Sequence, residues 1–141
     1  MFLIKHYFCR CFLLFLVNDN SRNIDNLEER YLMEDISIKI TDRNGTQHHV
    51  LAPTDMAMNL MEVVRSYELA PEGTIGVCGG MAMCASCQCY ILSNTELPIM
   101  QDEEDAMLSE AFYVKQNSRL GCQISITPNI HGLEVELAPE S

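Results

Sequence analysis

The chain has 141 residues and a formal net charge of −11, with 20 Asp and Glu against 9 Lys and Arg. Residues 1–32 hold four basic and four acidic residues, so all of the charge belongs to residues 33–141, which hold five basic and sixteen acidic residues. The length suits one domain. A surface this acidic keeps a protein soluble, repels nucleic acid and anionic lipid, and attracts basic patches on other proteins. We therefore expect protein partners and no nucleic acid.

The first seventeen residues are mostly apolar, but they match no targeting segment. Their longest unbroken apolar run is seven residues, 11–17, whereas a membrane-spanning helix needs about 20. Neither a small-residue cleavage site nor the Arg-rich and Ser-rich composition of a transit peptide is present. We expect no membrane span. We interpret residues 1–32 as an extension of doubtful role, or as sequence upstream of a start at Met33, and residues 33–141 as the domain.

Two strands joined by a tight turn are predicted at the start of this domain. Isoleucines at positions 36, 38 and 40 alternate with polar residues, which indicates a half-buried strand over 36–41. The segment Arg43–Thr46 contains Asn-Gly, the strongest short hairpin signal. Residues 47–52 are then predicted to return as the second strand.

A helix is predicted from Leu60 to Tyr67. Asn59 precedes it and Glu62 follows three residues later, which is the spacing of a capping box. One apolar face at helical spacing is formed by Leu60, Val63, Val64 and Tyr67.

The later elements complete an α+β pattern. Strands are predicted over 88–92 and 123–126, a helix over 102–112, and a short last strand around Val135 and Leu137. The buried face of the second helix is predicted to contain Met107, Leu108, Ala111 and Phe112. Strands interleaved with helices on one face favour an α+β sheet.

The spacing of four cysteines indicates a metal-binding site. They are Cys78, Cys84, Cys87 and Cys122, and their spacing is C-x5-C-x2-C-x34-C. A [2Fe–2S] cluster needs four thiolates, two for each iron, and the plant-type arrangement combines one tight loop with one distant cysteine. Gly79 and Gly80 tolerate the unusual φ values that such a loop demands, and they leave backbone N–H groups free to approach sulfur.

Other interpretations of the cysteines are weaker. A structural zinc site of four cysteines normally has two close pairs, and this chain has one, Cys84 with Cys87. Seven cysteines is an odd number, and no secretory signal implies the oxidising compartment that a disulfide framework needs. Cys89 follows the third candidate ligand, and we interpret it as a buried thiol. Arg119 is expected to bind backbone or carboxylate groups.

Residues 35–138 resemble a vertebrate-type, adrenodoxin-like [2Fe–2S] ferredoxin. The resemblance lies in the loop of residues 78–87, in Cys89–Ile91, in the acidic segment 101–108 and in Ser118–Gln123. It implies a β-grasp ferredoxin-like fold, in which a mixed sheet, a packed helix and a surface loop hold one [2Fe–2S] cluster. It also implies a soluble one-electron carrier rather than an enzyme.

The family also suggests partners and a location. Its members take electrons from a ferredoxin reductase and serve cytochrome P450 systems or the iron–sulfur assembly machinery. We expect a monomer in the cytoplasm, with the mitochondrial matrix as the alternative location. A structural zinc-binding interaction module remains the alternative function.

The acidic start of the second helix is the candidate partner surface: Asp102, Glu103, Glu104 and Asp105. Acidic residues also stabilise a helix N-terminus for purely structural reasons. In the resembled family this helix docks basic surfaces, and aspartates flank its Met-Leu pair. Here the flanking residues are Ala106 and Ser109, so we expect a docking role but not interchangeability with the family's best-known reductases.

Overall fold

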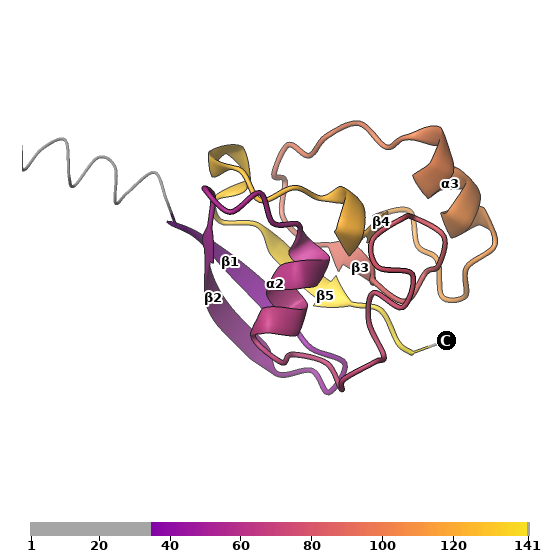
Figure 1. Ribbon diagram of the computed structural model, residues 1–141, viewed down its shortest axis with the longest axis horizontal. Helices are drawn as coiled ribbons and strands as arrows, with labels where there is room; N and C mark the ends of the chain where they lie inside the picture. The colour runs from indigo at the N-terminus through magenta and orange to yellow at the C-terminus, as the bar shows by residue number, and fades with distance from the viewer. Residues whose placement is uncertain (1–34, 141) are drawn as a thin grey trace, which may run out of the picture. The chain divides into compact units, whose positions relative to one another are not determined.

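The computed structural model describes residues 35–140, which form a mixed five-stranded sheet with a helix across one face (Figure 1). The strand order is β2-β1-β5-β3-β4, and only β1 and β5 pair in parallel. The strands are β1 (Asp35–Thr41), β2 (Gln47–Pro53), β3 (Gln88–Ile91), β4 (Ser118–Leu120) and β5 (Glu134–Leu137). The predicted α+β architecture is therefore confirmed, whereas the interpretation of residues 1–32 lies outside the described residues.

The predicted hairpin joins β1 and β2 in antiparallel register. The three isoleucines of β1 are buried, as their alternation predicted. The Asp42 carboxylate closes the turn by accepting hydrogen bonds from the N–H groups of Asn44 (2.9 Å) and Thr46 (3.0 Å). A hydrogen bond with the His48 ring, 2.8 Å long, lowers the pKa of Asp42 and holds the strand that follows the turn.

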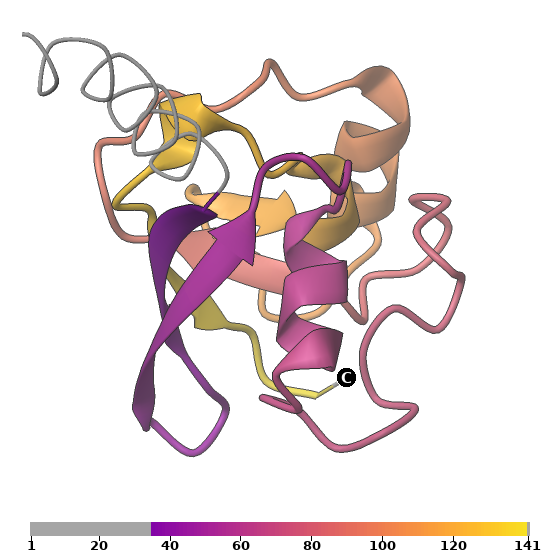
Figure 2. The same cartoon turned by 60° about the vertical axis from the view of Figure 1, so that its left-hand side comes forward.

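Helix α2 (Leu60–Ser66) begins at the predicted capping box. The Asn59 side chain accepts a hydrogen bond from the Glu62 N–H (3.0 Å), and the Glu62 carboxylate accepts one from the Asn59 N–H (2.9 Å). The helix lies against the sheet (Figure 2), and its buried side chains are Leu60, Met61, Val63 and Val64. The core therefore lies between α2 and the sheet.

Tyr67 was expected on this buried face, and that prediction is wrong. The helix ends one residue earlier, at Ser66, and Tyr67 is 46% exposed. Its hydroxyl donates a hydrogen bond to the Leu51 carbonyl (2.6 Å), which satisfies a phenol group that the core cannot pair. The ring thus braces α2 against β2 from outside the core.

The strand predicted over residues 123–126 is also wrong. The sheet's edge strand is instead β4, and a 3-10 turn, η1 (Gly121–Gln123), takes the chain off the sheet. The Ile124 carbonyl then accepts from the Leu60 N–H, and the Ile126 N–H donates to the Met58 carbonyl, both at 2.9 Å. The alternating burial of residues 123–126 comes from one isolated β-bridge, between Asn59 and Ser125, and not from a strand of the sheet. A second 3-10 turn, η2 (Pro128–Ile130), leads to β5.

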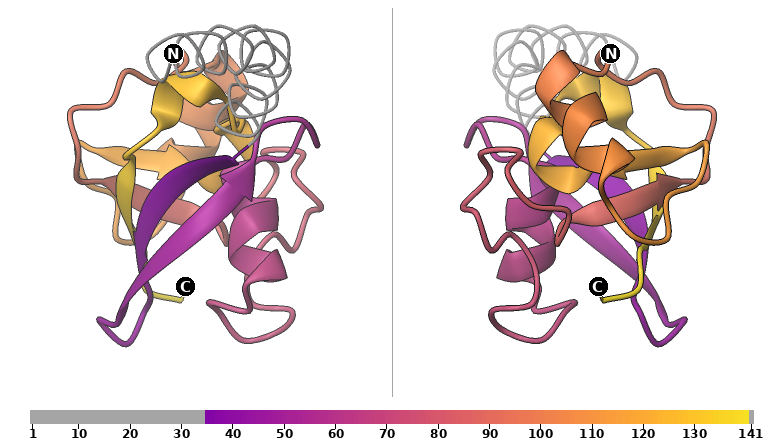
Figure 3. Two further views of the ribbon diagram at one scale, coloured as in Figure 1. Left: turned by 90° about the vertical axis from the view of Figure 1, so that its left-hand side faces the viewer. Right: turned by 90° about the vertical axis from the view of Figure 1, so that its right-hand side faces the viewer.

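Helix α3 (Asp102–Ser109) stands beside β4, at the edge of the sheet opposite β2 (Figure 3). It is shorter than predicted, because the chain leaves the helix at Glu110 and Tyr113 takes a positive φ of +58°. Phe112, predicted to be buried, is consequently 71% exposed. Within residues 35–140, no helix has the length and hydrophobicity needed to cross a membrane.

The capping box provides a test of this local structure. Asn59→Ala removes the acceptor for the Glu62 N–H, so we expect the free energy of unfolding to fall by about 1 kcal/mol. Urea unfolding followed by circular dichroism measures the change. Asn94→Ala, at an exposed position outside the helices and strands, is the control and should have little effect. Equal losses in both variants would contradict the role of Asn59.

Candidate metal centre

The four candidate thiols lie on the irregular segment between α2 and β3 and on the turn after β4. The loop curls through positive φ values at Gly79 (+75°) and Gly80 (+93°), which confirms the expectation for these glycines. Ala82 adopts a positive φ of +52° as well, and nothing in the sequence signalled it. Because L-residues rarely adopt this conformation, the surrounding loop must impose it.

The loop is held by hydrogen bonds from outside and within. The Arg43 guanidinium donates to the Thr74 hydroxyl (3.0 Å), the Ser86 carbonyl (3.3 Å) and the Ala138 carbonyl (3.0 Å). The Ser86 hydroxyl accepts from the Val77 N–H (3.0 Å) and lies 3.0 Å from the Cys84 sulfur. One arginine of the hairpin thus ties both ends of the loop to the last strand, a role that the sequence analysis missed.

The turn η1 carries Cys122 to the loop across 34 intervening residues. The Gly121 N–H donates to the Cys87 carbonyl (2.9 Å), which fixes the two chain segments side by side. A Cβ at position 121 would lie 3.1 Å from the same carbonyl oxygen, so only glycine fits this approach without displacing backbone.

The thiols come together as two pairs. Cys87 and Cys122 are buried and share a hydrogen bond, which raises the pKa of Cys87 and lowers that of Cys122 to about 6. Cys78 and Cys84 form the second, half-buried pair. Desolvation raises the pKa of Cys78, but hydrogen bonds from the loop N–H groups and from Cys84 outweigh it, so the net shift is downward.

These donor groups fit an anionic [2Fe–2S] cluster. Backbone N–H groups of Met83, Gly80 and Met81 lower the pKa of Cys78, because they favour its charged form. The Gln123 side-chain amide donates to the Cys122 sulfur at 3.4 Å. Within residues 35–140, no three His, Cys, Asp or Glu side chains gather around one point for a single ion. Two thiol pairs match the two thiolates per iron that such a cluster requires.

Glu104 does not belong to the exposed acidic surface, which corrects its assignment as a partner-binding residue. Its side chain is 1% exposed and forms a two-pronged ion pair with Arg119, at 2.8 and 3.0 Å. It also accepts the Leu120 N–H at 2.8 Å, two residues before Cys122. The expected contacts of Arg119 with carboxylate and backbone are confirmed, because it also donates to the Pro98 carbonyl (3.0 Å).

The other three acids of this segment, Asp102, Glu103 and Asp105, are exposed on α3. No Lys or Arg occurs between residues 93 and 114, so nothing close in sequence neutralises them. Through Glu104 and Leu120, this acidic face is attached directly to the turn that carries Cys122.

Cys89 is buried at 1% exposure, as expected for a packed thiol. Its sulfur donates a hydrogen bond to the Arg119 carbonyl at 3.6 Å, and burial raises its pKa to about 12. A neutral, buried thiol on β3 differs in kind from the paired thiols of the loop.

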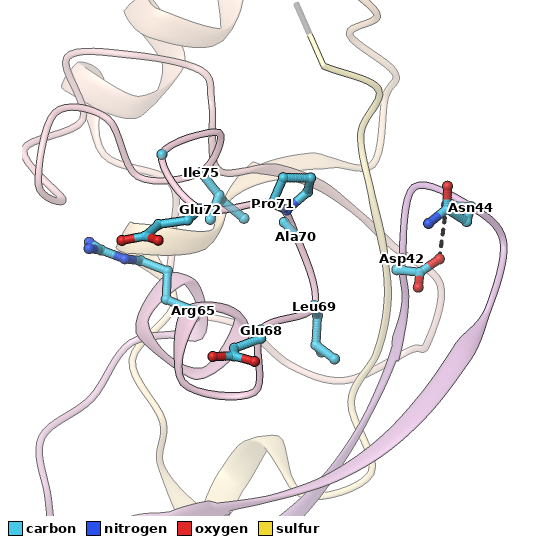
Figure 4. A pocket seen from close by; sticks show the side chains of 10 residues that line it. Asp42, Asn44, Arg65, Glu68, Leu69, Ala70, Pro71, Glu72 and Ile75 are labelled. Carbon is cyan, nitrogen blue, oxygen red and sulfur yellow. Dashed lines mark hydrogen bonds between the residues drawn. The ribbon is translucent and has the colours of Figure 1, made fainter.

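A hollow of about 680 Å³ lies elsewhere, between the β1–β2 turn and the segment after α2 (Figure 4). Figure 4 shows Arg65, Glu68 and Glu72 on one side of it, and Asp42 with Asn44 on the other. None of the five cysteines within residues 35–140 lines it. Glu68 and Glu72 provide exposed acids that are not part of α3.

Comparison with known proteins gives relatives of one kind, although no family model matches the chain. Rhodocoxin of Rhodococcus erythropolis is 34% identical over 100 residues, covering 69% of this chain and 90% of rhodocoxin. The 2Fe-2S ferredoxin of Rickettsia bellii is 32% identical over 104 residues, covering 72% and 89%. The mitochondrial adrenodoxin-like protein 2 of Arabidopsis thaliana is 29% identical, and the matched region spans 52% of its length.

Solved structures agree with the sequence relatives. Reduced putidaredoxin from Pseudomonas putida, a variant form, superposes with a TM-score of 0.66 at 28% identity, covering 74% of this chain and 97% of putidaredoxin. A ferredoxin from Rhodopseudomonas palustris gives the same TM-score and identity, covering 74% and 98%.

The fold and the relatives define a [2Fe–2S] electron carrier of β-grasp architecture, which is not an enzyme. The chain belongs to the adrenodoxin-like [2Fe–2S] ferredoxin family, with one cluster per chain. The expected family, fold and cofactor are thereby confirmed, and the zinc-binding alternative finds no support among the relatives.

The buried Glu104–Arg119 pair provides a test of how α3 is attached. Glu104→Ala leaves a buried guanidinium without its carboxylate, so we expect the free energy of unfolding to fall by about 3 kcal/mol. Asp105→Ala, on the exposed side of the same helix, should change it by less than about 0.5 kcal/mol. Urea unfolding of both cluster-loaded variants measures the difference, and equal effects would contradict a structural role for Glu104.

Proposed function

We propose that Cys78, Cys84, Cys87 and Cys122 hold the [2Fe–2S] cluster through which this protein carries one electron at a time. The approach of the turn that carries Cys122 to the loop that carries the other three thiols, fixed by the Gly121 N–H bond to the Cys87 carbonyl (2.9 Å), supports this assignment best. When bound, the cluster supplies one-electron redox chemistry. The chain's own groups hold and solvate it: loop N–H groups and the Gln123 amide point at thiol sulfur, where they stabilise negative charge.

The two thiol pairs differ in their exposure to solvent, so electron transfer is expected to favour one side of the site. Cys87 and Cys122 are buried under the loop, at 1% and 8% exposure, whereas Cys78 and Cys84 are half-buried. The side of the loop that carries Cys78 and Cys84 therefore gives the shorter path between the cluster and a docked protein.

Substitution of single cysteines tests the ligand set. Cys84→Ser and Cys122→Ser should each lose the native visible spectrum and the stoichiometry of two irons and two sulfides, since oxygen is a poor substitute for thiolate here. Cys89→Ser is the matched control and should keep both. Anaerobic purification followed by iron and sulfide analysis measures them. A native spectrum at full stoichiometry in Cys122→Ser would refute the assignment, as would its loss in Cys89→Ser alone.

We also propose a ferredoxin reductase as electron donor, with the acidic face of α3 as part of its docking surface. A structural relative, putidaredoxin, has been solved in a covalent complex with putidaredoxin reductase, and it matches this chain at 30% identity with a TM-score of 0.63. The exposed Asp102, Glu103 and Asp105 support this surface, because an uncompensated acidic patch steers basic partners. The acceptor is a cytochrome P450 or a component of iron–sulfur assembly.

Location and domain limits follow the same relatives. We propose residues 33–141 as the ferredoxin domain, since the bacterial relatives match 69–72% of the chain. Bacterial relatives are matched over most of their length, which supports the cytoplasm, and the mitochondrial relatives keep the matrix as the alternative.

Charge reversal tests the acidic face. Asp102→Lys with Glu103→Lys should slow reduction by a basic-surfaced reductase about tenfold at low ionic strength and flatten its salt dependence, because electrostatic steering is lost. Stopped-flow reduction with putidaredoxin reductase and with reductases from the host measures both effects. The control, Glu68→Lys with Glu72→Lys, makes the same change in net charge on the face of the hollow. Equal slowing in the two double variants would remove α3 from the proposal.

A further inference from the structure

The cluster loop is an uncharged, apolar part of an acidic protein. Residues 73–95 contain no Asp, Glu, Lys, Arg or His, although the chain as a whole carries a net charge of −11. Within this segment the large apolar side chains of Val77, Met81 and Met83 are 69%, 65% and 71% exposed. Single exposed apolar residues are ordinary on protein surfaces, but three within the eight residues 77–84, which include two of the thiols, form a local concentration.

The backbone fixes which residues of this loop face solvent. Ala82 is 8% exposed and adopts the positive φ noted above. Its two neighbours, Met81 and Met83, are therefore turned outward on either side of a residue that is turned inward. Ser86 similarly holds the Val77 backbone against Cys84. The apolar side chains are thus presented by a braced loop rather than by a slack one.

This apolar loop adjoins the acidic face. The turn carrying Cys122 contacts the loop through Gly121 and Cys87 and is attached to α3 through the Glu104–Leu120 hydrogen bond. The protein thus combines an uncharged area over the thiols with an acidic flank in a segment, residues 93–114, that contains no Lys or Arg. An interface of this kind has an apolar centre and a charged rim, which is the usual anatomy of a protein docking surface.

We propose that Met81 and Met83, with Val77, form the apolar contact by which an electron-transfer partner approaches the cluster. The partner is a protein whose electron entry point is an apolar patch flanked by Lys or Arg. This inference rests on the proposed function and adds the division of labour: α3 steers the encounter, and the methionines make the close contact. Methionine suits contact with more than one partner, since its unbranched, polarisable side chain repacks easily.

The test compares three variants of the cluster-loaded protein. Met81→Gln with Met83→Gln keeps side-chain length but removes the apolar surface, and Met81→Leu with Met83→Leu keeps the apolar surface. Met56→Gln is the matched control, because Met56 is 66% exposed outside the cluster loop. Each dithionite-reduced protein is mixed in a stopped-flow instrument with ferricytochrome c, a small basic haem protein. A second series uses hexacyanoferrate(III), an oxidant too small to need a docking surface.

The glutamine pair should slow electron transfer to ferricytochrome c about threefold to tenfold at high ionic strength, because burial of apolar side chains contributes binding free energy there. The rates with hexacyanoferrate(III) should stay unchanged, as should the slope against salt. The leucine pair and Met56→Gln should remain within about twofold of the parent protein, since neither removes the apolar contact.

Any of three results with ferricytochrome c would overturn the inference: a glutamine pair within twofold of the parent, a leucine pair as slow as the glutamine pair, or Met56→Gln equally slow. A changed visible spectrum or hexacyanoferrate(III) rate would place the methionines in the cluster's own environment and would overturn it too. Failure of the proposed function is read separately, from the absence of a cluster in the parent chain or its persistence in Cys122→Ser.

Discussion

The close approach of two backbone segments, at Gly121 and Cys87, is the constraint on which the rest of this structure depends. A hydrogen bond of 2.9 Å joins them, and the absence of a side chain at Gly121 permits it. Without this contact the three loop thiols would lack their fourth partner, since Cys122 is separated from them by 34 residues. The strand β4, which precedes the turn η1, and the helix α2, which contacts it, together position the turn that carries Cys122.

The run of acids that opens α3 contains one structural residue and three residues that we propose for recognition. Glu104 points inward and fixes Arg119 and the Leu120 N–H, so it belongs to the support of the metal centre. Its neighbours Asp102, Glu103 and Asp105 remain in solvent, where their charge is available to a partner. A buried carboxylate needs a paired cation, and Arg119 is the cation that the fold supplies. The proposed docking surface and the turn that carries Cys122 are therefore connected through a single side chain.

The acidic helix α3 and the uncharged segment that carries three of the thiols differ sharply in charge. Charge is concentrated on α3, whereas the 23 residues of segment 73–95 have none. Backbone N–H groups, rather than Lys or Arg, favour the charged form of Cys78. Because the loop contains no Lys or Arg, it supplies no cation that could neutralise the acidic flank. In the proposed docking mode, this separation lets long-range attraction and short-range apolar contact act through different residues.

Much of this could be predicted from local pattern. Alternation located β1, a capping box located α2, and cysteine spacing with two glycines indicated the metal centre, because each of these signals lies within a few residues. Predictions failed where neighbours distant in sequence decide the outcome. The hydroxyl of Tyr67 reaches β2, Phe112 lies beyond a helix that ends early, and residues 123–126 pair with the start of α2.

The sequence by itself determined the class of protein: its acidity, its strand and helix periods, and four thiols at a spacing typical of a [2Fe–2S] cluster. Tertiary structure alone decided which thiols pair, which acid of four turns inward, and that Arg43 ties the loop to the last strand. The physical reason is that period and spacing are properties of the local chain. Burial and hydrogen-bond partners, in contrast, are set by residues that only folding brings within reach.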